Sequence, residues 1–266
     1  MTHPVGRFTG SWAAVTGSAR AKGLGYALAR QLARRKINLV LVDILDEDLE
    51  ARAEELRRAY GVQVRPIAAD LSDLDAYPKI LDALSDITID VCICNHMYTP
   101  KETPKILDMP LDVHNAMIDI NARAYVNLIH PLANLMVKRG RGVVVVVSSA
   151  AGLTPTPYTG AYAANKAFQI AFGEALWFET RDTGVDVLVV SAGLMDTQGD
   201  ALSKYPKWQI ADPNDCAAEI LSAIGRKHMV TPGRANQLFT LINTRLMSRR
   251  RAVQTVGKFM ERGLGK

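Results

Sequence analysis

The chain has 266 residues, of which 48% are hydrophobic, so it is long enough to form one large domain around a buried core. Its start lacks a basic stretch and a long apolar stretch, and its apolar runs are far below the roughly 18 residues of a membrane span, so we expect a cytoplasmic protein. Residues 234–266 hold eight Lys or Arg against one Glu, a net charge of +7. Because the whole chain carries +5, residues 1–233 carry −2. The body of the protein is therefore not basic, which argues against a nucleic-acid partner.

Short apolar runs rich in β-branched residues alternate along the chain with segments of helical length. The predicted strands cover residues 12–16, 38–43, 62–68, 89–95, 142–149, 185–191 and 228–231. The predicted helices cover residues 24–35, 46–60, 74–84, 111–138, 161–180 and 213–225. Near-continuous apolar strands are typical of a parallel sheet buried on both faces. The alternation therefore predicts an α/β fold, either an open doubly wound sheet or a closed barrel.

A glycine-rich stretch, VTGSARAKGLG, joins the first predicted strand to the first predicted helix. Its glycines, Gly17, Gly23 and Gly25, would let the backbone approach a pyrophosphate at the amino end of the helix. An ordinary turn is the alternative, because the spacing is not the usual G-x-G-x-x-G.

Asp43 closes the second predicted strand, 26 residues after Gly17. A carboxylate at this place can accept hydrogen bonds from the adenosine ribose and would repel a 2′-phosphate. It favours the doubly wound, Rossmann-like sheet over the barrel, and NAD(H) over NADP(H). NADP(H) stays open, because Arg20 and Lys22 in the loop could reach a 2′-phosphate.

The three cysteines, Cys92, Cys94 and Cys216, are odd in number and form no C-x-x-C pair. This pattern favours a reducing compartment without a disulfide framework, and we predict no metal site.

Tyr162 and Lys166 stand four residues apart on a predicted helix, so that they share one face. A surface pair is one interpretation; the other is that the lysine charge lowers the pKa of the phenol, which then exchanges protons near neutral pH. Upstream, the apolar strand VVVVVSS ends in Ser148 and Ser149, at the sheet edge where ligands of open α/β folds bind.

Together these motifs resemble the short-chain dehydrogenase/reductase family over about residues 12–225. The family's T-G-x3-G-x-G loop is similar to the glycine-rich stretch from Thr16 to Gly25, with two extra residues. The other matching positions, in order, are Asp70 with Leu71, Asn121, Ser149, Tyr162 with Lys166, and the segment from Gly193 to Thr197, where Ala192 replaces a proline.

The resemblance implies a ketone–alcohol oxidoreductase with four catalytic residues. Tyr162 would transfer the proton, Lys166 would tune it and hold the nicotinamide ribose, Ser149 would bind the substrate oxygen, and Asn121 would hold a relay water. The implied cofactor-binding residues are Gly17, Ser18, Arg20, Gly23, Leu24, Gly25, Asp43, Asp70, Leu71, Asn95, Tyr162, Lys166, Gly193, Met195 and Thr197. Family members often form dimers or tetramers, here through residues 111–138 and 161–180.

One motif departs from the family pattern. Where the family usually has N-N-A-G, this chain has Cys94-Asn95-His96-Met97. His96 and Met97 imply a shifted backbone or a remodelled pocket. His96 would contact a ligand or, alternatively, be packed or face solvent.

The segment 194–212 should form the substrate side. Its apolar residues, with two from the motif after the fourth strand, are Met195, Leu202, Tyr205, Trp208, Met97 and Tyr98. They predict a lipophilic substrate, steroid-like or acyl-like. The alternative function is a non-catalytic dinucleotide-binding regulator or scaffold.

Residues 234–266 form a predicted basic, amphipathic helical extension of the catalytic domain, residues 1–233. Its apolar stripe would pack on the parent domain or on a partner subunit. Peripheral attachment to anionic lipid and contact with an acidic carrier protein are the alternatives.

Overall fold

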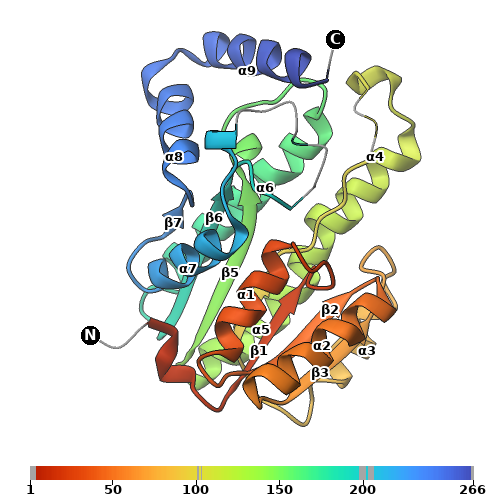
Figure 1. Ribbon diagram of the computed structural model, residues 1–266, viewed down its shortest axis with the longest axis vertical. Helices are drawn as coiled ribbons and strands as arrows, with labels where there is room; N and C mark the ends of the chain where they lie inside the picture. Colours follow the sequence, from red (N-terminus) through yellow and green to blue (C-terminus); the bar gives the residue numbers. More distant parts are fainter. Residues whose placement is uncertain (1–3, 101, 103, 198–201, 203–206, 265–266) are drawn as a thin grey trace.

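The computed structural model describes residues 4–100, 102, 104–197, 202 and 207–264 as a parallel sheet covered on both faces by helices (Figure 1). The strands are β1 Trp12–Thr16, β2 Asn38–Asp43, β3 Val64–Ala68, β4 Ile89–Cys94, β5 Gly142–Ser149, β6 Val185–Ala192 and β7 Met229–Val230. The helices are α1 Leu24–Ala33, α2 Asp46–Tyr60, α3 Ala76–Asp82, α4 Leu111–Ile118, α5 Ala124–Arg139, α6 Gly160–Glu179, α7 Pro213–Ala223, α8 Arg234–Leu241 and α9 Arg249–Leu264.

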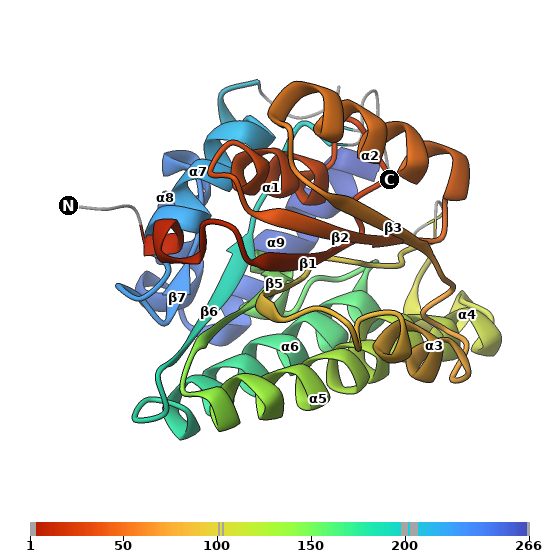
Figure 2. The same ribbon diagram turned by 90° about the horizontal axis from the view of Figure 1, so that it is seen from below.

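The strand order is β3-β2-β1-β4-β5-β6-β7, and every pair is parallel. This is the predicted doubly wound, Rossmann-like sheet, in which the strand order reverses next to β1. Figure 2 shows α1, α2 and α7 on one face and α3, α5 and α6 on the other. Two apolar cores fill the space between the sheet and these layers. The alternating side chains of strands β1 to β6 supply both cores, as the apolar strand sequences predict.

Local signals explain where several helices begin and end. Asp212 caps α7, because its carboxylate accepts from the backbone N–H groups of Asn214 and Asp215, and Pro213 fits the first helical position. After α2, Gly61 takes a left-handed conformation with φ +63° and ends the helix.

The predicted helix over residues 111–138 is continuous in space, but a π-helical turn, Asp119–Arg123, separates α4 from α5. Such turns occur often at functional sites. This one carries Asn121, which is fully buried.

Residues 234–264 leave the sheet after β7 and form α8, a π-helical turn Ile242–Leu246, and α9. Figure 1 shows α9 lying across the end of the molecule near the start of α6. In the part of the chain that the structure describes, no helix has the length and apolar character to cross a membrane.

Candidate active site

The glycine-rich loop lies at the carboxyl end of β1. It packs so closely against neighbouring backbone that its glycine positions have no space for a side chain. Gly17 has φ +66°, and a Cβ there would lie 2.8 Å from the His96 Cα. A Cβ on Gly25 would lie 2.2 Å from the Gly17 carbonyl oxygen, and one on Gly23 would lie 2.9 Å from that of Arg20. No side chain caps α1, so its first N–H groups stay available. This bare cradle at a helix amino end fits a dinucleotide pyrophosphate.

Asn95 fastens this loop to the end of β4. Its Nδ2 donates to the Gly17 carbonyl at 3.0 Å and to that of Thr16 at 3.3 Å. Its backbone N–H donates to the Thr16 Oγ1 at 3.0 Å. The retained asparagine of the altered N-N-A-G motif therefore shapes the loop.

Asp43 also holds the loop. Its Oδ2 accepts from the Ala19 N–H at 2.9 Å, and its Oδ1 accepts from the Ile44 N–H at 2.9 Å. A carboxylate has about four acceptor sites, so this partly exposed group retains capacity for ribose hydroxyls. Arg20 is exposed, whereas the Ser18 hydroxyl is buried and donates to the Val15 carbonyl, which leaves Ser18 only its backbone for a ligand.

The remaining predicted cofactor residues lie after β3 and β6. Asp70 is exposed, and its Oδ1 accepts from the Ser72 backbone and hydroxyl, while Leu71 is buried. After β6, a Cβ on Gly193 would lie 2.2 Å from the Asn236 side chain of α8. The glycine thus makes room for helix α8 of the C-terminal extension, residues 234–264, which we call the tail.

Residues of the predicted substrate side are scattered. Met195 and Leu202 are each 6% exposed, and Met195 belongs to a core cluster. Trp208 is 70% exposed, and Thr197 is partly exposed, its N–H donating to the Met195 carbonyl at 2.7 Å. Tyr205 lies outside the described residues.

Ser149, Tyr162 and Lys166 converge at the carboxyl end of β5. The Ser149 hydroxyl lies beside the Tyr162 phenol and accepts from the Ala151 N–H at 3.2 Å. The Lys166 Nζ lies 5.5 Å from the centroid of the Tyr162 ring. Lys166 is 2% exposed and donates to the Val147 carbonyl at 3.2 Å. The hydroxyl, the phenol and the ammonium therefore form one cluster.

Burial governs the ionisation of this cluster, and it reverses one expectation. We expected Lys166 to lower the pKa of Tyr162, but burial raises this pKa above its usual value, while the neighbouring Ser149 hydroxyl lowers it in part. Burial also lowers the pKa of Lys166 to about 7. The lysine thus titrates near neutral pH, and the phenol remains protonated there.

Asn121 stands beside the cluster on the π-helical turn. Its Oδ1 accepts from the Tyr98 N–H at 2.8 Å, and its Nδ2 donates to the Tyr98 carbonyl at 2.7 Å. Its own carbonyl accepts from the Gln169 Nε2 at 2.7 Å. The relay water implied for Asn121 stays a prediction. Our sequence reasoning missed Gln169, whose position three residues after Lys166 on one helix was the signal.

His96 is packed, as one of its two interpretations stated, while Met97 is 43% exposed. The His96 Nδ1 lies 2.7 Å from the Thr16 Oγ1, and its ring lies 4.4 Å from that of Tyr125. Burial, with a smaller effect of the Lys166 charge, lowers the pKa of His96 to about 3. The imidazole therefore stays neutral at physiological pH.

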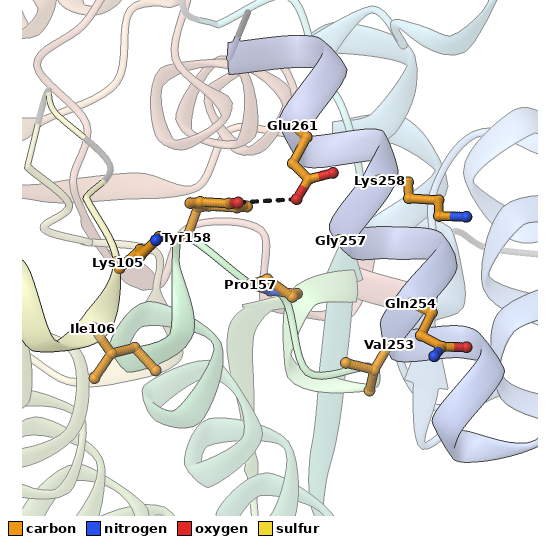
Figure 3. Close-up of a pocket in the computed structure, with 9 residues that line it drawn as sticks. All are labelled: Lys105, Ile106, Pro157, Tyr158, Val253, Gln254, Gly257, Lys258 and Glu261. Atoms are coloured by element: carbon orange, nitrogen blue, oxygen red, sulfur yellow. Dashed lines mark hydrogen bonds between the residues drawn. The ribbon is translucent and has the colours of Figure 1, made fainter. Parts of the chain in front are cut away.

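The tail forms one wall of a cavity next to the loop that leads into α6. The cavity has a volume of about 630 Å³ and is lined by Lys105, Ile106, Pro157, Tyr158, Val253, Gln254, Gly257, Lys258 and Glu261. The Tyr158 hydroxyl donates to the Glu261 Oε1 at 2.9 Å. Figure 3 shows these two side chains pointing toward each other, with Lys258 projecting away from Tyr158. On the tail, Ala252 and Val256 are buried. The apolar stripe of α9 therefore packs on the parent domain.

Comparisons with known proteins agree with this geometry. A family model described as short chain dehydrogenase matches residues 11–206. The chain is 29% identical over 239 residues to 7beta-hydroxysteroid dehydrogenase of Collinsella aerofaciens, covering 86% of this chain and 88% of that protein. It is 32% identical over 219 residues to very-long-chain 3-oxoacyl-CoA reductase-B of Danio rerio, covering 81% of this chain and 69% of that one.

Solved structures are similar as well. A structure from work on the stereoselectivity of 7beta-hydroxysteroid dehydrogenase has a TM-score of 0.88 at 26% identity, covering 96% of this chain and 99% of that one. A 3-oxoacyl-[acyl-carrier protein] reductase with bound NAD from Brucella melitensis has a TM-score of 0.76 at 26% identity, covering 88% and 93%. The chain belongs to the short chain dehydrogenase family and is an oxidoreductase with that family's NAD(P)-binding Rossmann fold.

Proposed function

We propose that the protein interconverts a ketone and a secondary alcohol on a lipophilic, steroid-like or acyl-like skeleton, with Tyr162 as the acid and base. The convergence of Ser149, Tyr162 and Lys166 carries this proposal. The relatives named as a hydroxysteroid dehydrogenase and a 3-oxoacyl-CoA reductase support the substrate class. The 630 Å³ cavity beside Tyr158 is the proposed place for the outer part of the substrate.

Each residue of the cluster has a distinct task in this reaction. A nicotinamide dinucleotide, when bound, would supply or accept the hydride. Tyr162 donates a proton to the carbonyl oxygen in reduction and accepts it in oxidation. Ser149 hydrogen-bonds the same oxygen and orients it, and the Lys166 ammonium stabilises the phenolate that remains.

Tyr162→Phe tests this assignment against the alternative of a non-catalytic dinucleotide-binding scaffold. We expect the wild type to change the absorbance at 340 nm steadily with lipophilic ketones. The variant should lose about 10³-fold in kcat/KM, the size of a general acid–base contribution. Turnover unchanged in the variant would refute the role of Tyr162, and no turnover by the wild type with any carbonyl tried would favour the scaffold.

We propose NAD(H) as the preferred dinucleotide. Support comes from Asp43, whose carboxylate stands at the end of β2 with acceptor capacity left. The exposed Arg20 and Lys22 are the groups that would favour NADP(H) instead. NADH should give at least about tenfold higher kcat/KM than NADPH, because a 2′-phosphate would lie against the carboxylate. Asp43→Ala should remove the difference, whereas Asp46→Ala, an exposed control on α2, should not. A wild-type preference for NADPH would overturn this choice.

We also propose that the protein works in the cytoplasm as a homodimer or homotetramer. The three cysteines are free and buried, which suits a reducing compartment. Large apolar side chains stay exposed on α5 and α6, namely Leu135, Phe168, Trp177 and Phe178. Light scattering of Phe178→Asp tests the contact, since a charge at the interface should yield a smaller species; an unchanged mass would place the interface elsewhere.

The outer side of the tail supports a proposed attachment to anionic lipid. Leu238, Leu241 and Leu246 are 55%, 50% and 71% exposed, and Arg245 and Arg249 beside them are exposed too. We expect sedimentation with phosphatidylglycerol vesicles, reduced by salt and by Leu246→Ser, but not with phosphatidylcholine vesicles. Leu107→Ser, which changes an exposed leucine elsewhere, is the control. Absence of binding at low salt would eliminate this proposal.

A further inference from the structure

Gln169 is a polar side chain in the core, one turn after Lys166 on α6. It is 0% exposed. A buried carboxamide must satisfy its hydrogen-bonding groups within the protein, because an unpaired amide there is destabilising. Its contacts therefore show what it holds.

Both ends of the carboxamide are used, and they connect two parts of the catalytic cluster. The Nε2 donates to the Asn121 carbonyl at 2.7 Å, and the Oε1 accepts from the Lys166 Nζ at 2.9 Å. Asn121 belongs to the π-helical turn between α4 and α5, and Lys166 belongs to α6. One side chain thus fixes the ammonium relative to the backbone of the neighbouring helix.

The surroundings of Lys166 make this contact important. The other acceptor of its Nζ in the described structure is the Val147 carbonyl, at 3.2 Å. The titratable groups that face it are Tyr162 of α6, Tyr125 of α5, whose ring centroid lies 5.8 Å away, and His96 after β4. None of these three is a carboxylate, so in the described contacts the ammonium is held by dipoles.

We propose that Gln169 is the positioning residue of Lys166: its carboxamide joins the ammonium to the Asn121 carbonyl and thereby sets where the lysine charge stands beside Tyr162. This inference rests on the proposed function of the cluster. It also assigns the Asn121 carbonyl to a fixed support. An amide N–H donates a hydrogen bond but does not give up its proton at neutral pH, so this link holds the lysine and does not relay protons.

Two substitutions separate this role from simple space filling. Gln169→Met keeps the length of the side chain and removes the acceptor, so the ammonium loses stabilisation and the pKa of Lys166 falls. Gln169→Glu places a carboxylate at the same position, so the pKa of Lys166 rises. A residue that only fills the core would not move the titration in opposite directions.

The measurement is the pH titration of the Lys166 side chain by NMR in protein with ¹³C-labelled lysine, with the signal assigned from Lys166→Arg. The wild-type midpoint should lie near pH 7. It should fall by about one pH unit in Gln169→Met and rise by at least about one pH unit in Gln169→Glu. The pH profile of kcat/KM should move in the same two directions.

Thr180→Val is the matched control, because Thr180 is a buried residue whose hydroxyl donates a part-buried hydrogen bond to the Leu176 carbonyl near the end of the same helix. It should lower stability without moving the Lys166 midpoint. Midpoints that stay at the wild-type value, or that move together in both Gln169 variants, would overturn the inference. Because the NMR titration needs no turnover, its outcome is separate from the failure of Tyr162 as the acid and base.

Discussion

The glycine-rich loop after β1 and the catalytic cluster between β5 and α6 lie at the same edge of the sheet, yet different contacts hold them. Backbone packed against backbone holds the loop, and Gly25 has no space for a methyl group. In the cluster, buried polar side chains bind one another, and burial changes how Lys166 ionises. The loop should therefore respond to volume and the cluster to charge.

Gly25→Ala tests whether the loop responds to added volume, and it should have the largest effect. The new Cβ would lie 2.2 Å from the Gly17 carbonyl and 2.7 Å from the Asn95 Nδ2, so the loop must move. We expect a cost of about 3 kcal/mol, typical of overpacking, and hence a ~100-fold rise in the Kd for the dinucleotide. Fluorescence titration with NADH measures it.

Gly6→Ala is the control, because a Cβ there meets nothing within 4 Å. Equal affinity of both variants and the wild type would show that the loop tolerates volume, and the contrast with the cluster would then disappear.

Lys166→Arg tests whether the catalytic cluster responds to charge. The pKa of Lys166 is lowered to about 7, so its ammonium is present below pH 7 and is lost as the pH rises through 7. A guanidinium stays charged over this range, so the limb of the kcat/KM profile near pH 7 should disappear. The level of kcat/KM should fall by about tenfold or more, because a planar group cannot take the same position.

Lys79→Arg, an exposed replacement on α3, should leave the profile unchanged. A limb that stays near pH 7 in Lys166→Arg would assign that ionisation to another group.

The contrast between local backbone features and packed polar side chains also explains which features could be predicted from the sequence. The parallel sheet and the positions of Gly17, Ser149 and Tyr162 follow from apolar periodicity and from short motifs, which are local properties of the chain. The structure confirms the doubly wound fold on these grounds.

Properties that depend on packing between segments distant in the chain could not be predicted from the sequence. The π-helical turn at Asn121 lies in a sequence that continues a helix without a break, and Met195 belongs to a core rather than to an open pocket. The pKa of Tyr162 was expected to fall, because a neighbouring lysine is visible in sequence and burial is not.

Glu261→Ala should have the smallest of these effects and extends the comparison to the tail. The carboxylate accepts from the Tyr158 hydroxyl at 2.9 Å and joins α9 to the loop before α6. A hydrogen bond of this kind contributes about 1 kcal/mol, which equals a roughly fivefold change in an equilibrium constant. Ala252 and Val256 stay buried, so α9 should remain docked.

The loss should therefore appear as a roughly fivefold higher KM for a bulky ketone, with little change in kcat or in the KM for a small ketone. Glu261→Gln keeps an acceptor and should restore most of the KM, and Thr255→Ala on the exposed side of α9 should be neutral. An equal rise in KM for small and bulky ketones would mean that this contact shapes the catalytic cluster itself. In that case the tail would be part of the cluster, because the Glu261 hydrogen bond to Tyr158 would act on Tyr162 through the three residues that lie between the two tyrosines.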